Sequence, residues 1–225
     1  TAVKLGGRWS DGPAKMVDDA DLERLLDVLE ERHEATGAAR YEPVSYLRDL
    51  VASGEGFYVD EGDGDGDDYD YDTLAVEVRD AVGHVRLDRP HRMNTVTTEL
   101  LDDLDDAVSR FEADESVRAI LVTGAGDRAF SAGADIQSMA GGVGDVNNAA
   151  EISRHGQAVT GRLESVDLPV VAGIDGYCLG GGMEIAMGAD LRIASERSEF
   201  GQPEHDLGLL PGWGGTVRLP RIVGM

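Results

Sequence analysis

Two glutamates stand next to glycine-containing segments, and their side chains are suited to shared proton-transfer chemistry. Glu184 follows Cys178–Met183, which contains a triple glycine, and Glu204 ends the segment Phe200–Glu204. A pair of carboxyl groups can remove one proton and supply another, which is general acid–base catalysis. Taken singly, Glu184 could instead be a solvated helix residue and Glu204 a turn residue, since only a minority of carboxyl groups have a strongly perturbed pKa.

Three glycine-containing segments precede or contain these glutamates. They are Phe130–Ile136, Cys178–Glu184 and Phe200–Glu204, the last continuing to Leu210–Thr216. Small residues let backbone N–H groups approach a ligand. The triple glycine follows a predicted strand and opens a predicted helix, and helix N-termini present unpaired N–H groups at the positive end of the helix dipole. The second segment therefore predicts an anion or oxyanion site.

Two other motifs suggest ligands that their context disfavours. Gly124–Ala129 fits the dinucleotide pattern G-x-G-x-x-G/A, but Phe130–Gly133 is a poor helix interior, and the loop Gly141–Gly144 stands where an acidic strand end is required. NAD binding is not expected there.

Asp60–Asp72 resembles a calcium loop, but it lacks the required Gly, and Leu74 replaces the final Glu. This segment is interpreted as an acidic linker, because it repels itself and cannot bury a core.

Three residues near the glutamates invite functional interpretation but have simpler ones. His205 adjoins Glu204, yet a lone His without a partner is interpreted as a flanking residue. Cys178 is interpreted as a small core hydrophobe rather than a nucleophile. Trp213 is expected to pack.

Predicted strands and helices alternate after residue 73, which is typical of an α/β domain. The expected strands are Leu74–Arg79, Val82–Leu87, Ala119–Val122, Pro169–Ile174 and Leu191–Ala194. The expected helices are Thr97–Phe111, Asn147–Ser165 and Gly182–Met187. Before them, Asp21–Glu34 and Pro43–Ala52 predict a small all-α segment.

The net charge of −24 excludes some partners and suggests an environment. Such a field repels nucleic acid and anionic membrane surfaces. Lys4 and Lys15 are the only lysines, and this acidic, lysine-poor composition is interpreted as adaptation to a salty cytoplasm, with an acidic mesophilic protein as the alternative. The sequence contains no apolar run of about 18 residues, so it predicts no membrane-spanning helix. The single cysteine fits a reducing compartment.

The three glycine segments, in this order and spacing, resemble the enoyl-CoA hydratase (crotonase) superfamily over residues 74–224. The resemblance implies a crotonase-like spiral of ββα units. It implies that the Ala134 and Gly181 N–H groups form an oxyanion hole, that Glu184 activates water, and that Glu204 delivers a proton. The implied reaction is hydration of a 2-enoyl-CoA. An isomerase and a non-catalytic acyl-CoA-binding fragment are the alternatives.

The resemblance also implies substrate contacts. Asp88–Asn94 is similar to a loop near coenzyme A, although His91 stands where relatives carry Lys, which makes Arg92 the candidate phosphate contact. The remaining residues assigned to substrate binding by this resemblance are Met93, Ala132, Asp135, Ile136 and Gly180. The CoA thioester is the expected small-molecule substrate, and no metal or cofactor is expected in this chain.

Residues 1–59 resemble the C-terminal helical portion of 3-hydroxyacyl-CoA dehydrogenases. The resemblance is carried by Leu22–Leu29, Tyr41–Pro43 and Gly54–Tyr58. It implies a fused β-oxidation enzyme with residues 60–73 as linker and 74–225 as hydratase domain, in which NAD serves only an absent dehydrogenase part. We therefore expect truncation at both ends, with C-terminal helices missing. The family also implies a homo-oligomer, either a trimer or a dimer of trimers.

Overall fold

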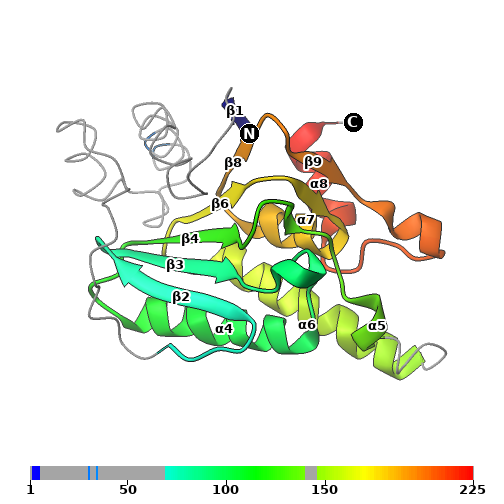
Figure 1. Cartoon of the computed structure of the whole chain (residues 1–225), viewed down its shortest axis with the longest axis horizontal. Helices are drawn as coiled ribbons and strands as arrows, with labels where there is room; N and C mark the ends of the chain where they lie inside the picture. Colours follow the sequence, from blue (N-terminus) through cyan, green and yellow to red (C-terminus); the bar gives the residue numbers. More distant parts are fainter. Residues whose placement is uncertain (1, 6–29, 31–33, 35–68, 140–145, 225) are drawn as a thin grey trace.

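The computed structural model describes residues 2–5, 30, 34, 69–139 and 146–224. The predicted helix Asp21–Glu34 is helical at Glu30 and Glu34, and its other residues lie outside this range. The predicted helix Pro43–Ala52, the dehydrogenase-like motifs and the linker up to residue 68 also lie outside it. The described chain forms two sheets and a set of helices (Figure 1).

The larger sheet has six strands in the order β1-β8-β6-β4-β3-β2. Its strands are β1 (Ala2–Leu5), β2 (Leu74–Arg79), β3 (Val82–Leu87), β4 (Ala119–Gly124), β6 (Val170–Ile174) and β8 (Leu191–Ser195). Only the β2–β3 pair is antiparallel, and it forms the predicted hairpin. The predicted alternation of strands and helices is confirmed, and β1 is a strand that the sequence reasoning did not identify.

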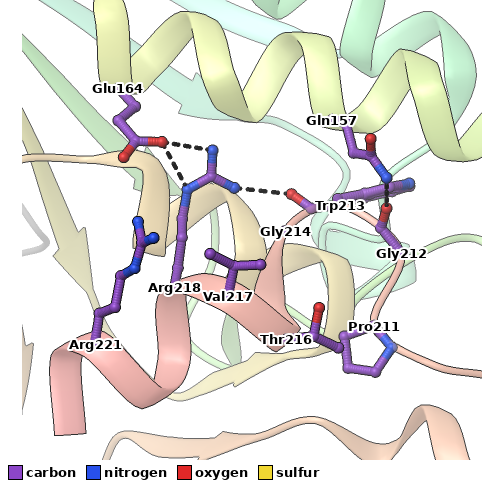
Figure 2. Close-up of a pocket in the computed structure, with 10 residues that line it drawn as sticks. All are labelled: Gln157, Glu164, Pro211, Gly212, Trp213, Gly214, Thr216, Val217, Arg218 and Arg221. Carbon is purple, nitrogen blue, oxygen red and sulfur yellow. Dashed lines mark hydrogen bonds and ion pairs between the residues drawn. The ribbon is translucent and has the colours of Figure 1, made fainter. Parts of the chain in front are cut away.

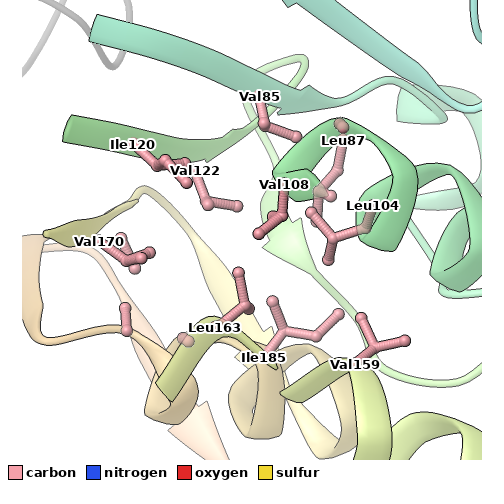
Figure 3. Packing of buried hydrophobic residues seen from close by; sticks show 14 of the residues in the cluster. Val85, Leu87, Leu104, Val108, Ile120, Val122, Val159, Leu163, Val170 and Ile185 are labelled. Carbon is pink, nitrogen blue, oxygen red and sulfur yellow. The ribbon is translucent and has the colours of Figure 1, made fainter. Parts of the chain in front are cut away.

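Two long helices cover one face of this sheet and bury the predicted apolar side chains. They are α4 (Thr98–Ala113), which the Thr97 hydroxyl caps by accepting from Leu100 N–H, and α6 (Val146–Ser165). The shorter α7 (Gly180–Gly188) packs against α6. Figure 3 shows strand and helix side chains meeting in the core between them: Val85, Leu87, Ile120, Val122 and Val170 from the sheet, and Leu104, Val108, Val159, Leu163 and Ile185 from the helices.

The smaller sheet is the feature that positions the glycine segments. It consists of β5 (Ala129–Ser131), β7 (Tyr177–Leu179) and β9 (Glu199–Gly201), all parallel and in that order. Parallel strands end at the same edge of their sheet, so the residues that follow each strand gather there. Those residues are the three predicted segments, and three-residue strands explain why periodicity did not reveal them.

The remaining elements are short. They are the 3₁₀ turns η2 (Pro90–Arg92) and η4 (Pro203–Leu207), and the helices α5 (Ile136–Met139) and α8 (Gly215–Val223). Helix α7 opens at Gly180, two residues before its predicted start. No helix in the described part of the chain is long and apolar enough to span a bilayer.

We expect Gly83→Ala to destabilise the fold, because a Cβ on Gly83 would lie 2.6 Å from the fully buried Phe111 ring. Overpacking of this kind lowers the free energy of unfolding by about 1–3 kcal/mol. The control is Gly161→Ala in α6, where a Cβ meets nothing within 4 Å and should raise stability by about 0.5–1 kcal/mol. Denaturant unfolding measures both. Equal effects of the two substitutions would contradict this packing.

Candidate active site

A cavity of about 410 Å³ lies at the edge where the three small strands end. Its walls are mostly apolar, and the polar side chains of Glu184 and Glu204 converge on it. Of the residues predicted to form the site, it is lined by Ala132, Ala134, Ile136, Gly180, Gly181, Glu184 and Glu204. The structure therefore brings both predicted glutamates and both predicted oxyanion-hole residues to one cavity.

The backbone around Ala134 leaves its N–H group available to a ligand. Val96 N–H donates to Gly133 O at 2.8 Å, and Asp135 N–H donates to Val96 O at 2.8 Å. Between these two bonds, Ala134 N–H has no acceptor among the residues the structure describes. Because Ala134 lines the cavity, its N–H is a candidate donor to a bound oxygen.

The second candidate donor comes from the first turn of α7, which approaches the Ala134 segment closely. Gly133 has φ 102°, and a Cβ there would lie 3.1 Å from Leu179 O and 3.6 Å from Gly181 N. Glycine at 133 therefore permits both this backbone conformation and the approach of the two turns. Gly181 is in the first turn of its helix, where N–H groups have no acceptor within the helix.

The triple glycine Gly180–Gly182 is closely packed at every position. A Cβ on its first residue would lie 3.1 Å from Glu204 Oε1, one on its second would overlap the Trp213 ring, and one on its third would lie 2.5 Å from the Ser131 side chain. The glycines therefore bring helix, carboxylate and ring together. Trp213 is buried, which confirms the prediction that it packs.

Glu184 is the most constrained carboxylate of the site. It is only 2% exposed, and its Oε1 accepts hydrogen bonds from Trp213 N–H and Gly215 N–H, both at 2.7 Å. Within the described ranges its Oε2 has no donor, and the side chain lines the cavity. Burial raises the pKa of Glu184, the two N–H groups oppose that rise, and nearby Glu204 adds to it. Such a carboxyl group is poised to exchange a proton with a ligand.

Glu204 presents an oxygen that lacks a protein partner. Its Oε2 is buried and has no hydrogen bond within the described structure, and its Oε1 faces Gly180. A buried carboxylate oxygen without a partner is unfavourable, so this geometry favours a water molecule or substrate group between the two glutamates. Glu204 reaches the cavity from η4, which follows β9.

Three predicted substrate-binding residues do not line the cavity, and their role in binding stays a prediction. Arg92 is exposed and donates to Gln137 Oε1 at 3.4 Å. Met93 has a left-handed backbone conformation, and its carbonyl accepts from Ala132 N–H at 2.9 Å. The Asp135 carboxylate is buried and accepts from inside the protein, from Arg89, Thr95 and Ser138. These bonds outweigh burial and lower its pKa.

Asn94 is a positioning residue to which the sequence reasoning gave no role. It is 0% exposed, and its Nδ2 donates to Ala125 O and Ala129 O, each at 2.9 Å, while its Oδ1 accepts from Arg89 N–H at 3.0 Å. It thus fastens the loop after β3 to the segment that leads into β5. Its φ of 53° in a non-glycine residue is the kind of position that a buried amide can stabilise.

The residues that were set aside occupy positions consistent with that interpretation. No helix opens at Gly124–Ala129, because β4 leads directly into β5 there. Cys178 is fully buried, and burial raises the pKa of its thiol. His205 is exposed and does not line the cavity, but the expectation that it lacks a partner is wrong, since its Nε2 lies 3.0 Å from Asp206 Oδ1.

We expect Glu184→Gln to be more stable than the wild type at neutral pH. The pKa of Glu184 is raised in the folded protein, so the folded state binds its proton more tightly than the unfolded state does. Stability from this group is then present below its unfolded pKa of about 4.3 and is lost as pH rises through the folded pKa.

The free energy of unfolding, measured against pH, should therefore show a stability advantage for Glu184→Gln that grows as pH rises above about 4.3 and then levels off. Glu199→Gln, at an exposed position on β9, is the control and should show no such trend. A stability difference between Glu184→Gln and wild type that is independent of pH would contradict the raised pKa.

Comparison with known proteins identifies the family. The sequence profile of the enoyl-CoA hydratase/isomerase family matches residues 77–225. A short-chain-enoyl-CoA hydratase of Clostridium acetobutylicum is 42% identical over 154 residues, which are 68% of this chain and 58% of that protein. The fatty acid oxidation complex subunit alpha of Idiomarina loihiensis is 41% identical over 68% of this chain and 22% of its own length.

The fold agrees with solved structures. The crystal structure of an enoyl-CoA hydratase from Thermoplasma volcanium shares 39% identity and a TM-score of 0.63, over 68% of this chain and 60% of that one. The chain thus spans about three fifths of the hydratases it matches. It has the crotonase fold and belongs to the enoyl-CoA hydratase/isomerase family.

Proposed function

We propose that this chain carries the catalytic residues of an enzyme that adds water to a trans-2-enoyl-CoA, giving a 3-hydroxyacyl-CoA. The observation that carries the proposal is the convergence of Glu184 and Glu204 on one cavity that the Ala134 and Gly181 backbones also line. One carboxylate is held by two N–H groups, and the other has a buried oxygen with no hydrogen-bond partner among the described residues.

In the proposed reaction, the Ala134 and Gly181 N–H groups hold the thioester oxygen while negative charge develops on it. Losing one such donor typically lowers the rate about 10²–10³-fold. Glu184 takes a proton from a water molecule, whose oxygen bonds to C3. Glu204 gives a proton to C2, so the double bond becomes single and the proton count balances. The wall around these groups is mostly apolar.

The CoA portion is assigned by resemblance. We propose that Arg92, exposed at the loop after β3, contacts phosphate, with Met93, Ala132 and Gly180 beside the thioester arm. Asp135 and Ile136 are proposed to lie near the adenine, Asp135 by its backbone because its carboxylate is engaged within the protein. No cofactor is proposed for this chain.

Two other functions compete with hydration. Isomerisation would move the double bond without adding an oxygen atom to the substrate, and an acyl-CoA-binding module would bind without turnover. The relatives favour hydration, because those from Clostridium acetobutylicum and Thermoplasma volcanium are named hydratases; the pair of glutamates does not decide, since isomerisation also removes one proton and supplies another. Product analysis separates isomerisation from hydration.

We further propose that the chain is part of a larger β-oxidation enzyme in which a dehydrogenase part uses NAD. The Idiomarina relative, named as a fatty acid oxidation complex subunit, is a longer protein of which this chain covers 22%, and the dehydrogenase part itself is proposed from the resemblance of residues 1–59. The assembly is proposed as a trimer or a dimer of trimers in a cytoplasm, without nucleic-acid or membrane partners. Light scattering on the full-length protein would measure its mass in solution.

Substitution of either glutamate tests the catalytic assignment. In the full-length protein, Glu184→Gln and Glu204→Gln should each lower kcat with crotonyl-CoA about 10²–10⁴-fold, because each removes one proton-transfer group. Loss of the conjugated enoyl thioester absorbance measures the rate. The exposed Glu199→Gln is the matched control and should retain wild-type activity. Unchanged rates in both site variants would refute the assignment.

Salt dependence tests the proposed environment. With a net charge of −24, hydration of the anionic substrate should be faster in molar KCl than at low ionic strength, because 1 M salt shortens the screening length to about 3 Å. KM for crotonyl-CoA should fall as salt rises. A KM that increases steadily with salt would instead indicate an enzyme adapted to dilute solution.

A further inference from the structure

The loop Pro211–Gly215 supplies both N–H groups that hold Glu184, so whatever fixes this loop also fixes the carboxylate. The loop leads into α8, whose first residue is Gly215, and it lies between two hollows. The catalytic cavity is on one side, and on the other is a hollow of about 350 Å³ lined by α6 and α8 residues. Figure 2 shows this second hollow, in which the loop carbonyls meet polar side chains.

The peptide group between Gly212 and Trp213 is held at both ends. Its N–H donates to Glu184 Oε1. Its carbonyl, Gly212 O, accepts from Ser153 Oγ at 2.9 Å. It also accepts from Gln157 Nε2 at 2.7 Å, as Figure 2 shows. Because a trans peptide is planar, its C=O and N–H point in opposite directions. Fixing the carbonyl therefore aims the N–H, and donors on the carbonyl also polarise the N–H.

The next peptide group, between Trp213 and Gly214, is held at its carbonyl, while the second Glu184 donor, Gly215 N–H, belongs to the peptide that follows it. Trp213 O accepts from Thr160 Oγ1 at 2.7 Å, the shortest contact of that hydroxyl, and from Arg218 Nη1 at 2.9 Å. The Arg218 side chain is 14% exposed, and Glu164 holds it through Nε at 3.0 Å and Nη2 at 2.7 Å (Figure 2). The ion pair with Glu164 thus fixes the Arg218 guanidinium in the position from which Nη1 donates to the Trp213 carbonyl.

The donors from α6 lie on one helix face, since Ser153, Gln157 and Thr160 are spaced by four and three residues. Gly156 of the same helix lets the Trp213 ring approach, because a Cβ there would overlap the ring. The opposite side of the ring meets Gly181. One side chain thus connects α6, the loop and the candidate oxyanion hole.

We propose that Gln157, Thr160 and Arg218 are positioning residues for Glu184, acting by holding the carbonyl groups of Gly212 and Trp213. We call these three residues the carbonyl clamp. None of them lines the catalytic cavity, so they act through the loop and do not touch the substrate. This inference rests on the proposed role of Glu184 and extends it to a network behind the site.

The clamp predicts a particular kinetic change. If it loosens, the N–H groups hold the Glu184 carboxylate less well, and because they lower its pKa, that pKa rises. A base must be ionised, so the acid limb of the kcat profile should move to higher pH. Thr160→Val and Gln157→Leu should each lower kcat about tenfold, since hydrogen bonds to a charged group are the strong ones. KM should stay within about twofold.

The effect of the Arg218 charge on Glu184 must be distinguished from the effect of positioning the loop. The charged groups acting on Glu184 are Glu204 of η4, which raises its pKa, and Arg218 of α8, which lowers it. Arg218→Met removes both a donor and a charge, whereas Thr160→Val changes no charge. Arg218→Lys keeps the charge and should recover part of the activity that Arg218→Met loses.

Matched controls come from the same hollow. Thr216→Val and Arg221→Met alter exposed residues of α8 and should leave kcat, KM and the pH profile as in the wild type. A second readout is independent of turnover. Infrared titration of the Glu184 carboxyl, assigned by its loss in Glu184→Gln, should show a higher pKa in Thr160→Val and Gln157→Leu.

The outcomes are distinct. A wild type that does not hydrate crotonyl-CoA refutes the proposed function, and the infrared titration still tests the clamp. An active wild type whose Thr160→Val and Gln157→Leu forms keep its kcat and its Glu184 titration refutes the clamp. So does a shift of equal size in Thr216→Val, or a rise in KM at constant kcat. If a clamp variant proves unfolded in a thermal melt, the kcat and the Glu184 titration of Arg218→Lys are used in its place to test the clamp.

Discussion

The structure depends most on the burial of one carboxylate. Glu184 is held almost entirely out of water by the Trp213 and Gly215 N–H groups, and burial of such a group is unfavourable unless its oxygens find partners. The loop that supplies these donors must therefore be fixed, which explains why polar side chains from α6 and α8 hold the loop carbonyls. Within the described part of the chain, the same arrangement leaves the other oxygen of this carboxylate without a donor at the cavity.

A second constraint is topological. The parallel strands β5, β7 and β9 end at one edge, so the candidate oxyanion hole, the triple glycine and Glu204 meet although they are about 70 residues apart in the chain. The close contacts of Gly180–Gly182 then set the distances between them. The candidate site lies at this edge, while the six-stranded sheet with α4 and α6 supplies the core.

The sequence predicted the larger elements and the chemistry-bearing segments well, for physical reasons. Long periodic patterns of apolar residues marked two of these elements. One is the face of α4 with Leu101, Leu104 and Val108, and the other is the hairpin of β2 and β3. The small sheet was missed because three residues carry no periodicity. The role of Asn94 and the engagement of Asp135 within the protein were also missed, because both depend on contacts 31 to 46 residues away. The roles of the site residues themselves stay predictions.

The most direct measurement of the central claim follows the oxygen atom. The full-length protein would be incubated with crotonyl-CoA in water enriched in oxygen-18, and the product analysed by mass spectrometry. We expect 3-hydroxybutyryl-CoA with one heavy oxygen at C3, because the proposed role of Glu184 is to activate a water molecule for addition at that carbon. Recovery of bound but unchanged crotonyl-CoA, or of a double-bond isomer without heavy oxygen, would contradict it.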